Sequence, residues 1–326
     1  RDRSPSRGLG DVYKRQFVIP CYASSKTLPA VVEEIDTTMT SMKQYTYEII
    51  MVNDYSPDDT FAVIRELCQQ KKNRTGINLA KNFGQHAALM AGFHYITGDI
   101  VVCLDDDGQT PANEVGKLLA QIENGYDVVY AEYENKQHSA FRNFGSRINK
   151  FMTEYMLDKP KDLYISSYFA ARRFIVDNML EYEHSYPYVI GLVLRATKNI
   201  TNVPVKHRAR LEGESGYSFK KLLALWFNGF TAFSVKPLRL ASCTGCLLAA
   251  LGFAYALYLI IRKLVHPQAI LLGWSSTISL LLIIGGIILL VLGIIGEYIG
   301  RIYICINRAP QYVIRDIIGD KEQPHE

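Results

Sequence analysis

An acidic run at residues 105–109, with the sequence DDDGQ, carries the side chains of this protein that are best suited to chemistry. It directly follows an apolar run, so Asp105, Asp107 and Gln109 stand where a buried strand would end. Carboxylate and amide oxygens are the hard ligands that Mg²⁺ and Mn²⁺ prefer. We therefore expect a divalent-metal site here, while a solvated turn remains open on these residues alone. A calcium-binding loop would place Cys103 at its first ligand position and fits less well.

Two further polar clusters follow apolar runs earlier in the chain. Pro20 and Tyr22 close the run 17–21, and Asp54 follows the run 48–53. Ligands of parallel sheets bind beyond the carboxyl ends of the strands, so we expect these clusters and the acidic run around one crevice. No G-x-G-x-x-G follows the first run, and no G-x-x-x-x-G-K-[ST] occurs anywhere in the chain. A phosphate-bearing ligand would therefore depend on a bound metal.

The elements that position these residues alternate along the chain. Short apolar runs separated by helix-like stretches predict βαβ units and a mainly parallel sheet; the runs span residues 17–21, 48–53, 76–79, 100–104 and 127–130. Ser56 and Pro57 are expected to begin a helix, as its N-cap and first residue. Residues 1–16 are polar and lack the apolar run of a signal peptide. We interpret them as a non-native or disordered leader, so the α/β fold is expected to begin at residue 17.

The apolar character of the chain is concentrated in its last third. Of the 326 residues 48% are hydrophobic and 21% charged, and the mean hydropathy is +0.01. The stretches 240–261 and 269–296 contain no charged residue, and each exceeds the roughly 20 apolar residues that cross a bilayer. We expect two transmembrane helices, at about 238–261 and 270–296. This pattern excludes a soluble enzyme and a many-span transporter.

Charge and cysteine usage indicate the compartment. A net charge of +4, from 36 basic and 32 acidic residues, does not indicate binding to nucleic acid. Basic residues flank both predicted spans, which places both flanks in the cytoplasm, although Arg262 and Lys263 in the connecting loop weaken this assignment. The six cysteines lack the spacing of a disulfide framework. We expect a multi-pass protein of the bacterial inner membrane with its head on the cytoplasmic side.

Together these motifs resemble those of the inverting family-two glycosyltransferases, specifically the polyprenyl-phosphate glycosyltransferases related to dolichol-phosphate mannose synthase. The similarity covers roughly residues 17–315 and rests on four ordered segments, which are VIPCY at 18–22, VND at 52–54, KNFG at 81–84 and LDDDGQTP at 104–111. The resemblance implies a GT-A-type nucleotide-sugar-binding domain. It also implies catalytic roles for Asp105 and Asp107. The implied donor-binding residues are Pro20, Tyr22, Asp54, Lys81 and Asp106. Mg²⁺ or Mn²⁺ would be held by Asp105, Asp107 and Gln109.

The acceptor is predicted from an absence. Enzymes of this superfamily that act on sugar hydroxyls usually carry an acidic general base on a later helix, expected here around 186–197. Residues 185–211 contain no Asp or Glu, which favours an acceptor that is already ionised, such as a phosphate monoester. The segment 210–217, RLEGESGY, resembles the family's R-x-x-G-x-S-x-Y phosphate loop, although a basic surface loop is the alternative. The implied acceptor contacts are Arg142, Ser146, Arg210, Ser215 and Tyr217.

The resulting layout has five parts. A leader at 1–16 precedes the GT-A catalytic domain at 17–217, an interfacial amphipathic helix at 218–236, two transmembrane helices within 237–299 and a cytoplasmic tail at 300–326. A buried core helix is the alternative for the amphipathic segment. We expect transfer of one sugar, with inversion, from a nucleoside diphosphate donor (UDP rather than GDP) to undecaprenyl or a similar polyprenyl phosphate. Glycines in the second span would also suit a homo-oligomer.

Two other functions remain open. Tyr133 stands where the family carries an arginine, and Ala23 where an asparagine is common, so a catalytically inactive sugar-nucleotide-binding subunit or scaffold is one alternative. A processive polysaccharide synthase is another. It would be expected to show a Q-x-x-R-W motif and more spans, whereas Trp226 and Trp274, the only tryptophans, lack that context.

Overall fold

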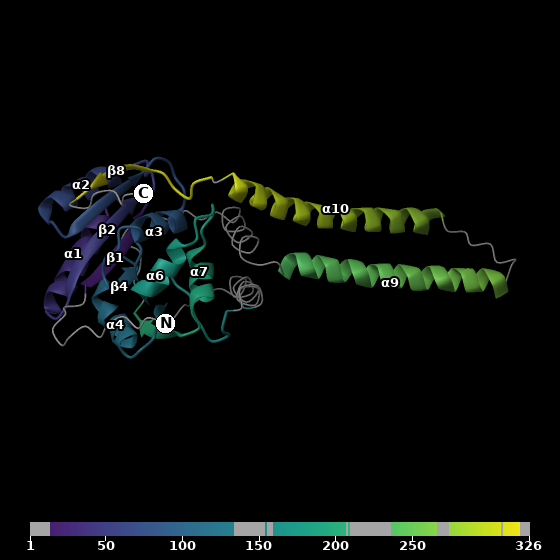
Figure 1. Cartoon of the computed structure of the whole chain (residues 1–326), viewed down its shortest axis with the longest axis horizontal. Helices are drawn as coiled ribbons and strands as arrows, with labels where there is room; N and C mark the ends of the chain where they lie inside the picture. Colours follow the sequence, from purple (N-terminus) through teal and green to yellow (C-terminus); the bar gives the residue numbers. More distant parts are fainter. Residues whose placement is uncertain are drawn as a thin grey trace. The chain divides into compact units, whose positions relative to one another are not determined.

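The computed structural model describes residues 14–133, 154, 159–206, 208, 236–265, 274–307 and 309–319 (Figure 1). The chain divides into two compact units. The first joins Arg1–Leu223 to Ala309–Glu326, and the second is Ala224–Arg308. The first unit is therefore discontinuous in sequence, because the second is inserted near its end.

One eight-stranded sheet forms the centre of the first unit, in the order β7-β5-β6-β4-β1-β2-β3-β8 (Figure 1). The strands are β1 (Lys14–Cys21), β2 (Thr46–Asn53), β3 (Arg74–Leu79), β4 (Ile100–Cys103), β5 (Val128–Tyr133), β6 (Phe169–Arg172), β7 (Ile200–Val205) and β8 (Ile314–Ile318). β1 pairs in parallel with β2 and β4, and β2 with β3. β6 and β8 run antiparallel to their neighbours. The predicted mainly parallel sheet is thus confirmed at its centre.

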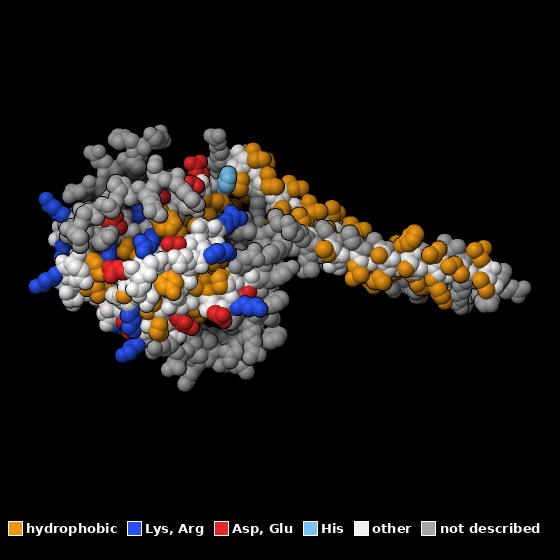
Figure 2. All heavy atoms as spheres, turned by 60° about the horizontal axis from the view of Figure 1, so that its bottom comes forward, with side chains coloured by type: hydrophobic (Ala, Val, Ile, Leu, Met, Phe, Trp, Pro, Cys, Tyr) orange, Lys and Arg blue, Asp and Glu red, His pale blue; other side chains and the backbone are white. Residues whose placement is uncertain are grey.

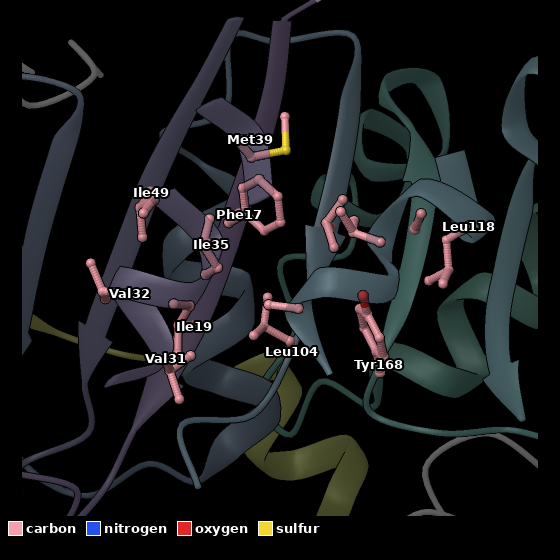
Figure 3. Packing of buried hydrophobic residues seen from close by; sticks show 14 of the residues in the cluster. Phe17, Ile19, Val31, Val32, Ile35, Met39, Ile49, Leu104, Leu118 and Tyr168 are labelled. Atoms are coloured by element: carbon pink, nitrogen blue, oxygen red, sulfur yellow. The ribbon is translucent and has the colours of Figure 1, made fainter. Parts of the chain in front are cut away.

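Helices cover both faces of this sheet. One face carries α1 (Leu28–Ser41), α2 (Thr60–Gln70), the 3₁₀ helix η1 (Ala112–Glu114) and α4 (Val115–Glu123). Their apolar side chains pack against alternate strand residues such as Phe17, Ile19 and Ile49, which are fully buried (Figure 3). This alternation is expected because successive strand side chains point to opposite faces.

The opposite face carries α3 (Gln85–Phe93), with α6 (Arg173–Leu180) and α7 (Val189–Ala196) beside it. Gly92 lets α3 lie close to the strands, because a Cβ at this position would come within 2.6 Å of Val18 Cγ1. The close approach fixes α3, whose first residue, Gln85, lies near the acidic run described below.

Two local predictions about element boundaries are wrong. α2 begins at Thr60 rather than at Pro57, and the Ser56 hydroxyl donates to Asn53 Oδ1 at 2.6 Å instead of capping a helix. β1 begins at Lys14, so the last residues of the expected leader belong to the sheet. The polar residue Arg15 is fully buried there, with Glu123 3.1 Å away and its guanidinium over the Tyr45 ring. Sequence hydropathy does not reveal the start of this strand, because its first three residues, KRQ, are polar.

The second unit contains two long helices, α9 (Lys236–Val265) and α10 (Trp274–Ile306). Both expose large apolar side chains, among them Leu251, Phe253 and Leu289 (Figure 2). Within the described parts of the chain, one helical segment, Ile283–Ile306, is long and apolar enough to cross a membrane, and Cys243–Tyr255 is a shorter apolar segment. Two helices thus overlap the two predicted spans, and the described segment that meets the length criterion lies at Ile283–Ile306 within α10 rather than at 270–296.

The predicted cytoplasmic tail at 300–326 has a different structure. α10 continues to Ile306, and β8 then pairs antiparallel with β3 at the edge of the sheet. Gly319, just beyond β8, has φ +125°, and a Cβ there would come within 2.9 Å of Arg74 O. The sequence does not predict this strand because five residues give little periodic signal, while the edge of β3 offers the strand unpaired backbone groups.

Candidate functional site

The carboxyl ends of three central strands meet, as the sequence predicts. The N–H of Asp54, after β2, donates to Cys21 O at 2.9 Å. The N–H of Tyr22, after β1, donates to Asp106 Oδ2 at 2.9 Å, and Asp106 follows β4. Tyr22 is 53% exposed, whereas Pro20 is buried inside β1 opposite Val52. A ligand at this edge would therefore meet Tyr22 and the acidic run together.

Asp54 fastens the neighbouring loop to the end of β2. It is only 3% exposed, and its Oδ1 and Oδ2 accept hydrogen bonds from the N–H groups of Phe83 and Gly84 at 2.7 and 2.8 Å. Burial raises the pKa of Asp54, and the two N–H donors act in the opposite direction. Lys81 begins this loop, is exposed, and holds its ammonium 4.9 Å from the centre of the Phe83 ring. The loop thus places a cation beside the predicted donor residues.

Asp105 is held by two donors that the sequence analysis did not identify. Gln85 Nε2 donates to Oδ1 at 2.9 Å, and the Ser167 hydroxyl donates to Oδ2. Burial, together with the charges of Asp107 and Asp106, raises the pKa of Asp105 to about 6. Gln85 directly follows the KNFG segment and could have been found by its position. Ser167 precedes β6 in a segment without a motif, and only the fold brings it here.

The remaining acidic residues divide into different roles. Asp106 faces the end of β1 through its contact with Tyr22, and burial raises its pKa. Asp107 Oδ1 accepts a hydrogen bond from the N–H of Gln109 at 3.0 Å, across Gly108, which has φ +74°. The Asp107 side chain and the Gln109 backbone are therefore joined within the turn itself.

The donor set was tested for its fit to a divalent cation. Over the described ranges there is no group of three or more His, Cys, Asp or Glu side chains that would enclose a metal. Both carboxylate oxygens of Asp105 and the Oδ1 of Asp107 already accept hydrogen bonds, but each oxygen keeps a further lone pair, so Asp105, Asp107 and Gln109 all remain candidate ligands. Mg²⁺ commonly takes one or two protein carboxylates and completes its shell with water and substrate phosphates. The residues fit such a partly open site.

Tyr133, the residue in place of a family arginine, ends β5 near the acidic run. Burial raises the pKa of its phenol, and the charges of Asp105 and Asp107 raise it further. The predicted acceptor contacts lie outside the described residues; they are Arg142, Ser146, Arg210, Ser215 and Tyr217. Among the described residues, Arg208 lies two positions before Arg210, and Tyr133 lies nine positions before Arg142.

The helix expected to carry a general base carries none. α7 covers most of the range 186–197, and its buried side chains are apolar. Its ionisable residue is Arg195, in the last turn. α7 therefore offers no carboxylate to accept a proton from a hydroxyl.

The sheet and its helices form an α/β fold of the GT-A type. A crystal structure of glucosyl-3-phosphoglycerate synthase from Mycobacterium tuberculosis, in complex with Mn²⁺ and UDP-glucose, matches with a TM-score of 0.51 over 70% of this chain and 83% of that chain, at 17% identity. The glycosyl transferase family 2 model matches residues 16–180, and the GtrB C-terminal hairpin model matches residues 236–302. The chain belongs to glycosyl transferase family 2, so it is a glycosyltransferase.

Two relatives match along almost their whole length. The undecaprenyl-phosphate 4-deoxy-4-formamido-L-arabinose transferase of Klebsiella pneumoniae is 33% identical over 313 residues, 95% of each chain. The protein of the same name from Photorhabdus laumondii is 34% identical over 315 residues, 95% of this chain and 96% of its own. Both the catalytic head and the hairpin are included in these matches.

Proposed function

We propose that this protein transfers a single sugar, with inversion, from a nucleoside diphosphate sugar to undecaprenyl phosphate or a similar polyprenyl phosphate. The observation that carries the proposal is the meeting of Tyr22, Asp54 and Asp106 at the ends of β1, β2 and β4, within a chain that matches undecaprenyl-phosphate sugar transferases end to end. The strand ends support a donor site at this edge of the sheet, and the names of the relatives support undecaprenyl phosphate as the class of acceptor.

The donor contacts follow from the site. Tyr22, Asp54, Lys81 and Asp106 would bind the nucleotide sugar, with Lys81 placed to meet diphosphate charge. Asp107 and Gln109 would hold Mg²⁺ or Mn²⁺, which when bound neutralises charge on the departing nucleoside diphosphate. The Mn²⁺ and UDP-glucose of the M. tuberculosis protein, which shares the fold, support a UDP donor.

Asp105 completes the catalytic pair with Asp107. Gln85 and Ser167 each donate to a different oxygen of its carboxylate, which fixes the orientation of this group. Asp105 would therefore meet the donor as a carboxylate held in one position. Each of its oxygens keeps a further lone pair, so Asp105 would also share the metal with Asp107 and Gln109.

The acceptor chemistry follows from the apolar character of α7. A hydroxyl acceptor must lose a proton to a base during attack, and the described residues of α7 supply no carboxylate. A phosphate monoester is ionised at neutral pH and attacks the anomeric carbon without such help. Basic residues nearby would bind it, although Arg208 is already paired with Glu34 at 2.9 Å. Arg142, Ser146, Arg210, Ser215 and Tyr217 are the proposed phosphate contacts.

The membrane assignment supports the same reaction. The hairpin of α9 and α10 would anchor the protein in the inner membrane, with 218–236 in the interface and the head in the cytoplasm by the positive-inside rule. A long-chain lipid phosphate presents its head group at that surface. The exposed apolar side chains of both helices suit lipid contact or contact with a second copy of the chain.

The test is transfer of labelled sugar into an organic-extractable lipid by membranes that contain this protein. UDP- and GDP-sugars are offered with undecaprenyl phosphate and Mg²⁺ or Mn²⁺, beside a chelator, Asp107→Asn and the control Asp177→Asn, which removes an exposed carboxylate paired with Arg173. We expect lipid-linked label that is lost with chelator and with Asp107→Asn only. Nucleotide binding without transfer from any donor would indicate an inactive binding subunit. Transfer that survives Asp107→Asn would contradict the metal assignment.

A further inference from the structure

A line of hydrogen bonds crosses the sheet from the donor loop to the strand that follows the hairpin. The N–H of Ala23 donates to Ser56 Oγ at 3.1 Å, and the Ser56 hydroxyl donates to Asn53 Oδ1 at 2.6 Å. Asn53 Nδ2 donates to Asn78 Oδ1 at 2.8 Å. Asn78 Nδ2 donates to Asp316 Oδ2 at 2.9 Å. The line therefore joins loops after β1 and β2 to β8 through β3.

The two ends of this line fix its direction. A backbone N–H can only donate, and an ionised carboxylate can only accept. Asn53 Oδ1 also faces the N–H of Ser56 at 3.3 Å, so its amide nitrogen must point to Asn78. Asn78 then presents its own amide nitrogen to Asp316. Asn53 and Asn78 are 3% and 9% exposed, and hydrogen bonds in series within such a low-dielectric setting strengthen one another.

The backbone of the C-terminal segment is built to bring Asp316 to this position. β8 pairs with β3 so that Asp316 lies opposite Asn78, and a register shift then brings Ile314 opposite Leu79. A bulge of this kind re-aims side chains at the edge of a sheet. Arg315 Nε also lies 3.9 Å from Asp316 Oδ2.

The same segment supports a second loop of the donor site. The N–H of Ala80 donates to Val313 O at 2.8 Å. Ala80 directly precedes the loop whose Phe83 and Gly84 hold Asp54. The segment after the hairpin thus reaches the loop that carries Tyr22 through side chains. It reaches the loop that holds Asp54 through the backbone.

The geometry points to Asp316 as a positioning residue for the nucleotide-sugar site, acting through Asn78, Asn53 and Ser56 on the loop at Tyr22 and Ala23. This inference rests on the proposed function, which places the donor at that loop. Without the carboxylate, the Asn78 amide nitrogen loses its acceptor, so Asn78 holds Asn53 less firmly and Asn53 in turn holds Ser56 less firmly. The Ser56 hydroxyl is then less well fixed opposite the N–H of Ala23, whose φ is +53°. The loop becomes less ordered, and donor binding weakens.

The test uses the full-length protein in detergent with the variants Asp316→Ala and Asp316→Asn, and Asp177→Ala as the matched control. Asp316→Ala is expected to raise the KM for the nucleotide sugar and the Kd for UDP with Mg²⁺ about two- to fivefold, because the Asp316 carboxylate is half exposed and solvent screens part of its hydrogen bond; kcat should change little. Asp316→Asn keeps an acceptor oxygen, so its KM and Kd should lie close to those of the native protein. The control should bind donor normally.

Hydrogen exchange gives a readout that does not depend on turnover. The amides of residues 22–25 should exchange faster in Asp316→Ala and at the native rate in Asp177→Ala. Unchanged exchange there would overturn the inference, whatever the transfer assay shows. Absence of transfer by the native protein from every donor would instead refute the proposed function, and the exchange measurement would still decide the role of Asp316.

A double-mutant cycle separates transmission from simple destabilisation. Ser56→Ala cuts the line at its other end, so adding Asp316→Ala to it should raise the Kd for UDP no further. Additive effects of the two changes would show that Asp316 acts by another route and would overturn the inference.

Discussion

Replacing Asp54 by Asn tests whether its carboxylate holds the loop at Phe83 and Gly84. The native carboxylate accepts one N–H on each oxygen, at 2.7 and 2.8 Å. An amide of the same shape keeps one acceptor oxygen and turns an NH₂ group toward the other N–H. One hydrogen bond to a charged group is therefore lost, and a buried donor is left without an acceptor.

The magnitude follows from these contacts. Losing such a bond costs about 2 kcal/mol locally, which is roughly a 30-fold increase in opening of the loop, since 1.4 kcal/mol is a factor of ten. The effect on the free energy of global unfolding is smaller, because burial raises the pKa of Asp54 and so penalises its charge at neutral pH. Asn carries no charge and escapes that penalty. We expect a local change with little shift in the midpoint of unfolding.

Hydrogen exchange measured by mass spectrometry on the full-length protein provides the assay. The peptide that contains Phe83 and Gly84 should exchange roughly 30-fold faster in Asp54→Asn, while β2 keeps its native rate and the control Asp177→Asn changes neither. Native exchange rates at Phe83 and Gly84 would refute the reasoning. Equal acceleration in β2 would refute it as well, because it would show global destabilisation instead of a released loop.

Three further substitutions test other features of the head by thermal unfolding. Burial lowers the pKa of His86 to about 4, below the unfolded value of about 6.5, so the free energy of unfolding should fall by up to about 3 kcal/mol as the pH drops from 6.5 to 4. His86→Leu should remove this part of the pH dependence. A pH profile of Tm that is the same in the variant and the native protein would contradict this role of His86. Ala23→Gly should raise Tm, because glycine relieves the φ of +53° by about 0.5 to 1 kcal/mol net; a lower Tm would argue against strain there. Gly319→Ala should lower Tm and loosen β8 by about 1 to 3 kcal/mol, because its Cβ would press on Arg74 O; native exchange in β8 would contradict this.

The sequence predicts the site where chemistry and topology coincide. Tyr22, Asp54 and the acidic run each follow an apolar run, and the rule that ligands bind at the carboxyl ends of parallel strands is enough to bring them together. The structure agrees, down to the contact of the Tyr22 N–H with Asp106. Such predictions succeed because strand order and direction, rather than side-chain detail, decide the outcome.

What the sequence does not reveal depends on contacts between distant segments. Ser167 reaches Asp105 across 62 residues of chain, and Arg15 is buried because Glu123 and Tyr45 surround it. Neither residue has a local pattern that hydropathy or motif spacing can detect. Each of these residues has a partner that only the complete fold supplies.

The C-terminal strand shows why the catalytic head is not an independent module of the sequence. β3 would present an open edge without β8, and open edges invite pairing with other chains. The strand that closes this edge is made only after the hairpin, since Ala309 follows α10 within three residues. The segment also supplies Asp316 to Asn78 and the Val313 carbonyl to Ala80. Completion of the donor site therefore requires the chain on both sides of the hairpin, which ties the order of the nucleotide site to the synthesis of the membrane anchor.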